Sequence, residues 1–202
     1  MEVNANAVKE LREKTGAGIM DCKKALAETG GNLEKAVDYL RQKGLAAAAK
    51  KADRLATDGA VAAYVHPGGK IGVLVEINCE TDFVARTAEF QALLKDIAMQ
   101  VAAANPRCVR REEVPAEEVE KEKSIYRQQA QEQRKPENVT EKIVEGKMER
   151  FYSEICLLEQ AFIKDPDRKV SDILNDAVAR LKENIQVRRF ARYHLGEGKQ
   201  KN

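Results

Sequence analysis

The hydrophobic pattern changes its period sharply in the middle of the chain. From Ile71 to Ile77 apolar residues alternate with smaller or polar ones, and a period of two predicts a half-buried strand. From Phe90 to Val101 apolar residues recur at helical spacing, so a helix from Thr87 to about Ala103 should pack on that sheet, with Thr87 as its cap. A chain that joins a strand to a helix in this way folds as a mixed structure.

The neighbouring segments predict an α+β fold. A strand through Val61, Ala63 and Val65, followed by a turn at residues 67–69, forms a hairpin with the next strand. Near the carboxyl end, a helical pattern gives way at Asn184 to a last strand over residues 185–195. We therefore expect a core domain over residues 58–198, built on an antiparallel sheet with packed helices, and a disordered tail at 199–202.

Three short helical patterns precede this core. Glycines separate them, and the third has Asn32 as its cap and Gly44 at its end. Residues 1–44 therefore predict a three-helix module. Residues 45–57 combine strong helix formers with little apolar periodicity, which predicts a helical linker.

Residues 115–162 are charge-dense and helical in pattern. A single break at Lys135-Pro136 divides them into a first arm with few apolar positions and a second arm with a clearer apolar stripe, and the pattern breaks again at Asp165-Pro166. This arrangement predicts an antiparallel helical hairpin that projects from the core.

The composition excludes several classes of protein. Charged residues make up 34% of the 202 residues, yet the net charge is only +2, which argues against a general nucleic-acid binder. The cysteines have neither disulfide-framework nor zinc spacing, so we expect free thiols. We also expect no membrane association and a cytoplasmic location, because no apolar run approaches a membrane span.

The sequence offers little material for catalysis. The two histidines, His66 and His194, have no catalytic partner at a recognised spacing. The glycine pairs lack the other residues of a phosphate loop and are expected to form turns. Glu80 and Asp82 have no third ligand nearby for a metal. We therefore expect no enzymatic activity, no cofactor and no metal.

The last strand suggests an alternative function. Arg188, Phe190, Arg192 and His194 share one face, and a basic strip with an aromatic residue inside it is typical of platforms for single-stranded nucleic acid. Arginines on a strand also form solvated or ion-paired faces, and acidic helical segments at 115–133 and 141–149 are available as partners. An RNA-binding protein associated with translation is the alternative hypothesis.

The connection at residues 78–86 is the strongest candidate for a functional surface. It carries Phe83 beside Asp82 between the strand and the helix. A Phe in this place is either exposed and held rigidly for another protein to contact or folded back onto its own core. The residues alone leave both readings open.

Four motifs together resemble the bacterial elongation factor Ts family. The run from Glu10 to Leu26 is similar to that family's ubiquitin-associated-like (UBA-like) module, and Cys79 to Ala85 is similar to its central signature. Residues 145–148 and 195–198 also match. The resemblance extends over nearly the whole chain, in order.

The resemblance implies guanine-nucleotide exchange on elongation factor Tu, the GTPase that carries aminoacyl-tRNA. Asp82 and Phe83, flanked by Thr81 and Val84, match the wedge that enters near the magnesium site and loosens GDP. The matching positions for docking on the GTPase domain are Arg12, Ile19, Met20 and Lys23.

The resemblance also implies a short form of the family. Longer members carry two related sheet-containing halves, whereas this core resembles a merged single copy, in which His66 matches a contact residue of the second half. A single half leaves an open sheet edge, so a homodimer is expected.

Overall fold

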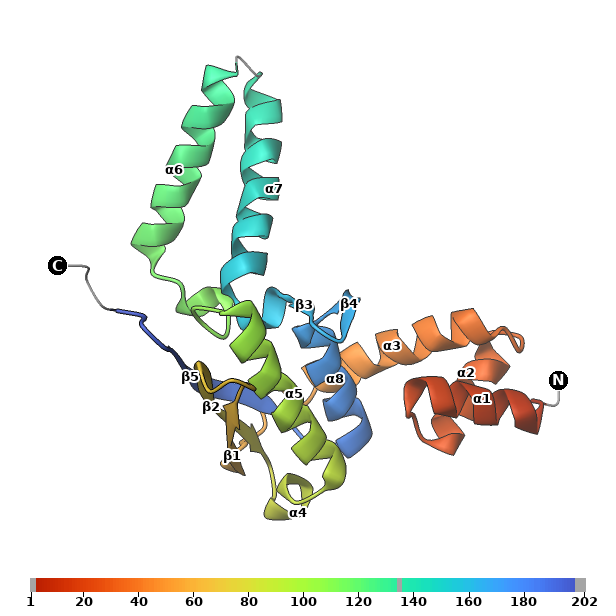
Figure 1. The fold of residues 1–202 in the computed structure, drawn as a ribbon. Coiled ribbons are helices and arrows are strands. Elements are labelled where there is room, and N and C mark those ends of the chain that lie inside the picture. The colour runs from red at the N-terminus through yellow and green to blue at the C-terminus, as the bar shows by residue number, and fades with distance from the viewer. Residues whose placement is uncertain (1–2, 134–135, 199–202) are drawn as a thin grey trace. The chain divides into compact units, whose positions relative to one another are not determined.

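The computed structural model describes residues 3–133 and 136–198 (Figure 1). Its helices are α1 (Ala5–Thr15), α2 (Ile19–Glu28), α3 (Leu33–Ala49), α4 (Asp82–Ala85), α5 (Ala88–Ala104), α6 (Ala116–Glu132), α7 (Glu137–Ile155) and α8 (Val170–Leu181), with 3-10 turns η1 (Arg111–Glu113) and η2 (Leu157–Glu159). Its strands are β1 (Asp58–Val65), β2 (Ile71–Cys79), β3 (Ala161–Phe162), β4 (Asp165–Lys169) and β5 (Gln186–His194). The predicted α+β class is confirmed.

Helices α1, α2 and α3 pack around a small core of their own. The predicted cap of α3 is confirmed, since the Asn32 side chain accepts a hydrogen bond from the Lys35 N–H at 2.9 Å. Asn4 caps α1 in a similar way, accepting from the Asn6 N–H at 2.9 Å. The fully buried residues of this core are small or medium in size: Leu11, Cys22, Ala25, Leu26 and Ala36.

The predicted end of the third helix at Gly44 is wrong, because α3 continues to Ala49. Gly44 is buried, and a Cβ built on it would lie 3.5 Å from the Cβ of Ala179 in α8. The glycine thus lies inside the helix, beside α8, and does not end the helix. The expected helical linker at 45–57 is therefore helical only over residues 45–49, and residues 50–57 belong to neither helix nor strand.

Strands β1, β2 and β5 form a three-stranded sheet in that order. The His66 N–H donates to the Ile71 carbonyl at 2.9 Å and closes the predicted hairpin. The Leu195 N–H donates to the Lys70 carbonyl at 2.8 Å, so the end of β5 lies beside the start of β2 and runs antiparallel to it. Strand β1 is an edge of this sheet.

The connection after β2 contains a helical turn, α4, which the sequence pattern did not predict. Helix α5 follows, and Thr87 caps it as predicted, because its hydroxyl accepts from the Phe90 N–H at 3.2 Å. The predicted apolar stripe of α5 is buried along its whole length: Phe90, Leu93, Leu94, Ile97, Ala98 and Val101.

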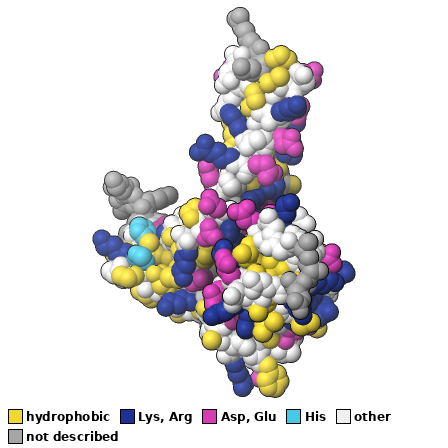
Figure 2. Space-filling model, turned by 90° about the vertical axis from the view of Figure 1, so that its right-hand side faces the viewer, with side chains coloured by type: hydrophobic (Ala, Val, Ile, Leu, Met, Phe, Trp, Pro, Cys, Tyr) yellow, Lys and Arg dark blue, Asp and Glu magenta, His cyan; other side chains and the backbone are white. Residues whose placement is uncertain are grey.

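Helices α6 and α7 lie side by side (Figure 1). Pro136 directly precedes α7, whereas Lys135 of the expected break lies outside the described residues. Side chains of both charges are interleaved along these helices (Figure 2). Few side chains of the pair are fully buried, namely Ala130, Thr140, Val144 and Met148.

The chain after α7 departs from the prediction. A helical hairpin was expected to reach residue 162, but α7 ends at Ile155, and Phe162 lies in the short strand β3, which pairs antiparallel with β4. A buried amide pair supports this small hairpin. Gln100 donates to the Gln160 side chain at 3.1 Å and accepts from the Ile163 N–H at 2.8 Å. Hydrogen bonds between residues so far apart in the chain cannot be predicted from the local sequence pattern.

The chain divides into two compact units, each built from separate stretches. Unit 1 contains residues 1–60, 77–93 and 172–186, and unit 2 contains residues 61–76, 94–171 and 187–202. This division differs from the expected boundaries after residues 44 and 57, because residues 77–93 and 172–186 group with the amino-terminal helices. The expected tail at 199–202 lies outside the described residues.

All four cysteines are free thiols, as expected. Within unit 2, the sulfurs of Cys108 and Cys156 lie 3.5 Å apart and form a weak hydrogen bond. Burial raises the pKa of Cys156 to about 12. Within the described ranges, the structure contains no helix that is both long enough and apolar enough to cross a bilayer.

Candidate functional site

The one-turn helix α4 presents Phe83 to solvent. Phe83 is 79% exposed, which decides between the two interpretations left open by the sequence. Thr81 caps the turn by accepting from the Val84 N–H at 3.4 Å. Asp82 and Arg86 form an ion pair at 2.8 Å across the turn. We call Thr81, Asp82, Phe83 and Val84 the exchange tip, after the role that the sequence resemblance implies for them.

A carboxylate from the other end of unit 1 holds the start of the exchange tip. One Glu183 oxygen accepts from the backbone N–H groups of Glu80 at 3.0 Å and Thr81 at 3.1 Å. The other Glu183 oxygen accepts from the Thr81 hydroxyl at 2.6 Å. Hydrogen bonds to an ionised acceptor are shorter and stronger than neutral ones. Residues 102 or 103 positions apart in sequence are thereby fixed together.

In a second contact, between Glu80 and Asn184, the carboxylate belongs to the turn before α4 and the N–H group to the segment after α8. A Glu80 side-chain oxygen accepts from the Asn184 N–H at 2.7 Å. The buried Asn184 side chain donates in turn to the carbonyls of Ala52 at 3.2 Å and Arg54 at 2.7 Å. The turn before α4 is therefore tied both to the end of α8 and to the segment after α3.

Two further hydrogen bonds restrain the backbone of the tip. The Cys79 thiol donates to the Thr81 carbonyl at 3.1 Å, and burial raises the pKa of that thiol to about 11, so it carries its proton at neutral pH. The Gln91 side chain donates to the Ala85 carbonyl at 2.7 Å. Hydrogen bonds thus restrain the backbone at both ends of α4, while the Phe83 side chain between them is exposed to solvent.

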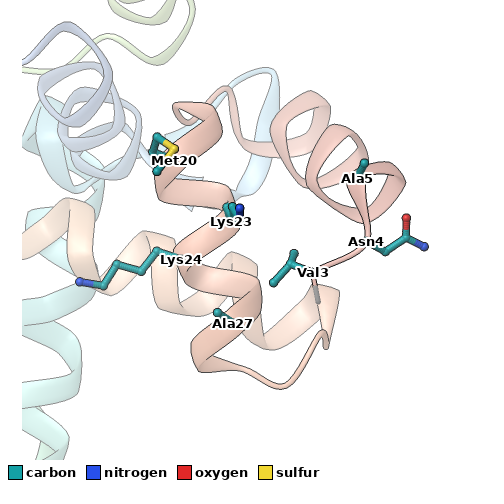
Figure 3. Close-up of a pocket in the computed structure, with 7 residues that line it drawn as sticks. All are labelled: Val3, Asn4, Ala5, Met20, Lys23, Lys24 and Ala27. Carbon is teal, nitrogen blue, oxygen red and sulfur yellow. The ribbon is translucent and has the colours of Figure 1, made fainter. Parts of the chain in front are cut away.

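A second exposed surface lies on α1 and α2. Met20 is 75% exposed, and Arg12, Ile19 and Lys23 are exposed as well. Figure 3 shows a pocket between the start of α1 and α2, where Met20 and Lys23 lie near Val3. The remaining residues around the pocket are Asn4, Ala5, Lys24 and Ala27. All four residues expected to dock on a partner are therefore accessible, and two of them, Met20 and Lys23, line this pocket.

His66, the last of the expected contact residues, belongs to unit 2. It follows β1, and its Nδ1 lies 3.1 Å from the Tyr64 hydroxyl in an exposed hydrogen bond. The predicted basic strip on β5 is not a continuous exposed platform. The Arg192 side chain is only 12% exposed, donates to the Ala102 carbonyl at 3.3 Å and lies 3.6 Å from Glu197.

One face of the sheet in unit 2 carries exposed apolar side chains. Val61 and Val65 of β1, Leu74 of β2 and Tyr193 of β5 are all exposed. We call these four residues the apolar sheet face. Arg189 and Glu76 on the same strands form an ion pair at 2.7 Å. The alternation of β1 had been predicted, but not that its valines face solvent.

Within the part of the chain that the structure describes, no three histidine, cysteine or acidic side chains converge on a point where a metal ion could be held. Glu183 and Asn184, which fix the exchange tip, were missed as functional candidates. Nothing in their local sequence marks them, because their role depends on chain segments about a hundred residues away.

Comparison with known proteins gives one consistent result. The family model described as elongation factor TS matches residues 5–197. Elongation factor Ts of Anaeromyxobacter dehalogenans is 67% identical over 200 residues, which cover 99% of this chain and 91% of the relative. The Geobacter sulfurreducens protein of the same name is 65% identical over 201 residues, covering 100% and 93% of the two chains. That of Desulforamulus reducens is 62% identical, covering 99% and 92%. The chain therefore belongs to the elongation factor Ts family.

Proposed function

We propose that this protein is a guanine-nucleotide exchange factor that acts on elongation factor Tu during translation elongation in the cytoplasm. Family membership supports the partner and the activity. The exposed ring of Phe83, mounted on a hydrogen-bonded turn, is the observation that supports the mechanism. The proposed function requires no catalytic residue and no cofactor in this chain.

In the proposed mechanism, the exchange tip acts as a wedge. Magnesium and backbone N–H groups hold the phosphates of GDP in a GTPase. Insertion of Asp82 and Phe83 beside these elements displaces them and weakens nucleotide binding without cleaving a covalent bond. Linkage makes the effect reciprocal: if the factor lowers the affinity for nucleotide, nucleotide lowers the affinity for the factor by the same ratio. Binding of fresh GTP then releases the factor.

The surface on α1 and α2 provides the proposed docking site for the GTPase domain. By resemblance, α1 to α3 form the family's UBA-like module, with Arg12, Ile19, Met20 and Lys23 at the contact positions. Met20 is a flexible, polarizable side chain that adapts to an apolar partner surface. Its high exposure and the adjoining pocket (Figure 3) support this assignment. His66 is proposed as an additional contact.

We further propose that the protein acts as a homodimer. Strand β1 is an edge of the sheet, and the four residues of the apolar sheet face are exposed to solvent in a single chain. Self-association buries such a face. Light scattering should therefore give about twice the chain mass of 22.5 kDa at micromolar concentration, and Val65→Lys should shift the mass to that of one chain. A wild-type mass of one chain would rule out a stable dimer.

The exchange function is tested by release of labelled GDP from elongation factor Tu. Phe83→Ala should slow release by about tenfold or more, because truncation of a central aromatic anchor commonly costs 2 kcal/mol or above. Asp82→Ala should slow it as well. Leu55→Ala is the matched control, since Leu55 is also 79% exposed but lies outside both proposed contact surfaces.

The expected pattern is slow exchange by both tip variants with wild-type melting temperatures and normal exchange by Leu55→Ala. Wild-type exchange rates for both Phe83→Ala and Asp82→Ala would show that the wedge is assigned to the wrong residues. If neither the wild type nor any variant accelerates GDP release, the exchange function itself is refuted.

A further inference from the structure

The end of α8 adopts a backbone conformation that needs an explanation. Lys182 follows the last helical residue with φ 64°, in the left-handed region, and its N–H donates to the Val178 carbonyl at 3.1 Å. A residue with a Cβ in this region is strained by about 1 kcal/mol, and such strain persists only where surrounding contacts hold it. The next two residues are Glu183 and Asn184, which bind the turn before α4.

Both oxygens of the Glu183 carboxylate bind that turn. Its two oxygens accept three hydrogen bonds, two from backbone N–H groups and one from the Thr81 hydroxyl. The Thr81 hydroxyl oxygen in turn accepts from the Val84 N–H. Because this hydroxyl donates its only proton to Glu183, its lone pairs are left to face the first turn of α4. The chain of hydrogen bonds therefore runs from Glu183 through Thr81 into α4.

We propose that Glu183 is a positioning residue for nucleotide exchange, which it supports by holding the exchange tip in one conformation before the partner arrives. This inference rests on the proposed function. An exposed aromatic ring on an unrestrained loop must lose conformational freedom on binding, and that loss reduces the benefit of its contacts. A tip whose backbone is already fixed avoids this cost. Glu183 touches neither nucleotide nor GTPase in this proposal, since the turn occupies both of its oxygens.

Two substitutions of Glu183 remove different numbers of its hydrogen bonds and should therefore reduce nucleotide exchange to different extents. Glu183→Gln keeps one carbonyl oxygen for the backbone N–H groups but replaces the other acceptor with an NH₂ group, whereas Glu183→Ala removes all three hydrogen bonds. At saturating concentrations of the factor, the maximal rate of GDP release should fall about threefold for Glu183→Gln and about tenfold for Glu183→Ala. The concentration for half-saturation should change by less than about twofold, because the docking surface on α1 and α2 is intact.

A double-substitution experiment asks whether Glu183 acts through the aromatic ring. If it does, Glu183→Ala should have little further effect in a chain that already carries Phe83→Ala, so the two losses should not multiply. Two losses that multiply in full would overturn the inference, because Glu183 would then act independently of the tip.

Hydrogen exchange measures directly how firmly Glu183 holds the backbone N–H groups of the turn. In Glu183→Gln, the backbone N–H groups of Glu80 and Thr81 should exchange about tenfold faster or more, while those in the middle of α5 should be unchanged. Glu112→Gln is the matched control, because it makes the same chemical change on an exposed residue of η1. It should alter neither exchange kinetics nor amide protection. Unchanged protection of residues 80 and 81 in Glu183→Gln would contradict the proposed role.

The outcomes separate this inference from the function on which it rests. Slow GDP release by Phe83→Ala together with a wild-type maximal rate for Glu183→Ala would leave the exchange function in place and overturn the positioning role. A wild-type rate for Phe83→Ala would overturn the wedge and the positioning role together. A loss in Glu183→Ala that only follows a loss of folded protein, seen as a lowered melting temperature with no change in Glu183→Gln, would also reject the inference.

Discussion

The exchange tip and the pair of helices α6 and α7 use charged residues in opposite ways. At the tip, one carboxylate, Glu183, receives three hydrogen bonds from a turn far away in the sequence. Between α6 and α7, Arg127 and Glu141 meet in a solvent-exposed contact at 3.2 Å, in which both side chains are about half exposed. The first arrangement fixes a backbone, while the second joins two flexible side chains.

The difference shows that the density of charge in a sequence is a poor guide to where charge matters. Exposed ion pairs are worth about 0–1 kcal/mol, because the side chains lose freedom and water screens the attraction. The helix pair therefore depends on its few buried residues, Val144 and Met148 among them. The tip depends on directed hydrogen bonds to backbone groups, which are stronger when the acceptor is ionised.

The largest expected effect comes from truncating the buried side chain of Met148, which is 5% exposed. Met148→Ala should reduce the free energy of opening of the helix pair by about 2–4 kcal/mol, because the lost burial is joined by a cavity. Hydrogen exchange should then show lost protection in α6 and α7 but unchanged protection in residues 80–84. Val139→Ala, on the same helix but more exposed, should change protection little. An equal loss of protection in both regions would show that Met148 is not specific to the stability of the helix pair.

A smaller effect is expected at Glu159, which lies in η2 directly after α7. Hydrogen bonds from Arg111, above all, and from Lys169 lower the pKa of Glu159 to about 2, against an ordinary value of 4.5. A depressed pKa in the folded state means that the carboxylate stabilises the fold above about pH 4.5, and that this contribution is lost as the pH falls toward about 2.

Glu159→Gln should therefore destabilise the protein by roughly 1–3 kcal/mol near neutral pH and by much less near pH 2. Urea unfolding at both pH values measures the difference. Since Glu159 accepts from the side chains of Arg111 and Lys169, whereas Glu183 accepts from residues 80 and 81, this variant should leave the protection of residues 80 and 81 unchanged. A stability loss that is the same at both pH values would show that the charge of Glu159 is not the cause.

The smallest effect is expected for the exposed pair on the helices. A double-mutant cycle with Arg127→Ala and Glu141→Ala should give a coupling energy of about 0.5 kcal/mol, and added salt should reduce it further. The coupling is measured from urea unfolding of the wild type, both single variants and the double variant. A coupling of about 2 kcal/mol or more would mean that the solvated pair is as important to the helix pair as the buried contacts.

Local pattern predicted much of the fold. The alternation of strand β2, the cap at Thr87 and the buried stripe of α5 were all correct, because each depends on residues within a few positions of one another. Predictions based on glycine were less secure. Gly44 does not end α3 but lies buried inside it, beside Ala179 of α8. A glycine at a helix end and a glycine at a helix contact look alike in sequence.

The candidate site was only half visible in the sequence. The strand-to-helix connection and its family motif indicated Phe83, but whether the ring is exposed stayed open until the fold was known. The short strands β3 and β4 and the buried amide contact of Gln100 with Gln160 were missed for the same reason as Glu183. Each depends on hydrogen bonds between segments that are distant along the chain.

The sequence by itself determined the periodicity of the helices and strands, the family and the position of the tip, since these follow from the identity and spacing of neighbouring residues. Only the tertiary structure decided that Phe83 faces solvent and that Glu183 and Asn184 hold the turn beneath it. The physical reason is that burial and long-range hydrogen bonds are properties of how distant segments meet. A single α-helical turn is too short to be stable on its own, so its conformation must be supplied by the rest of the fold.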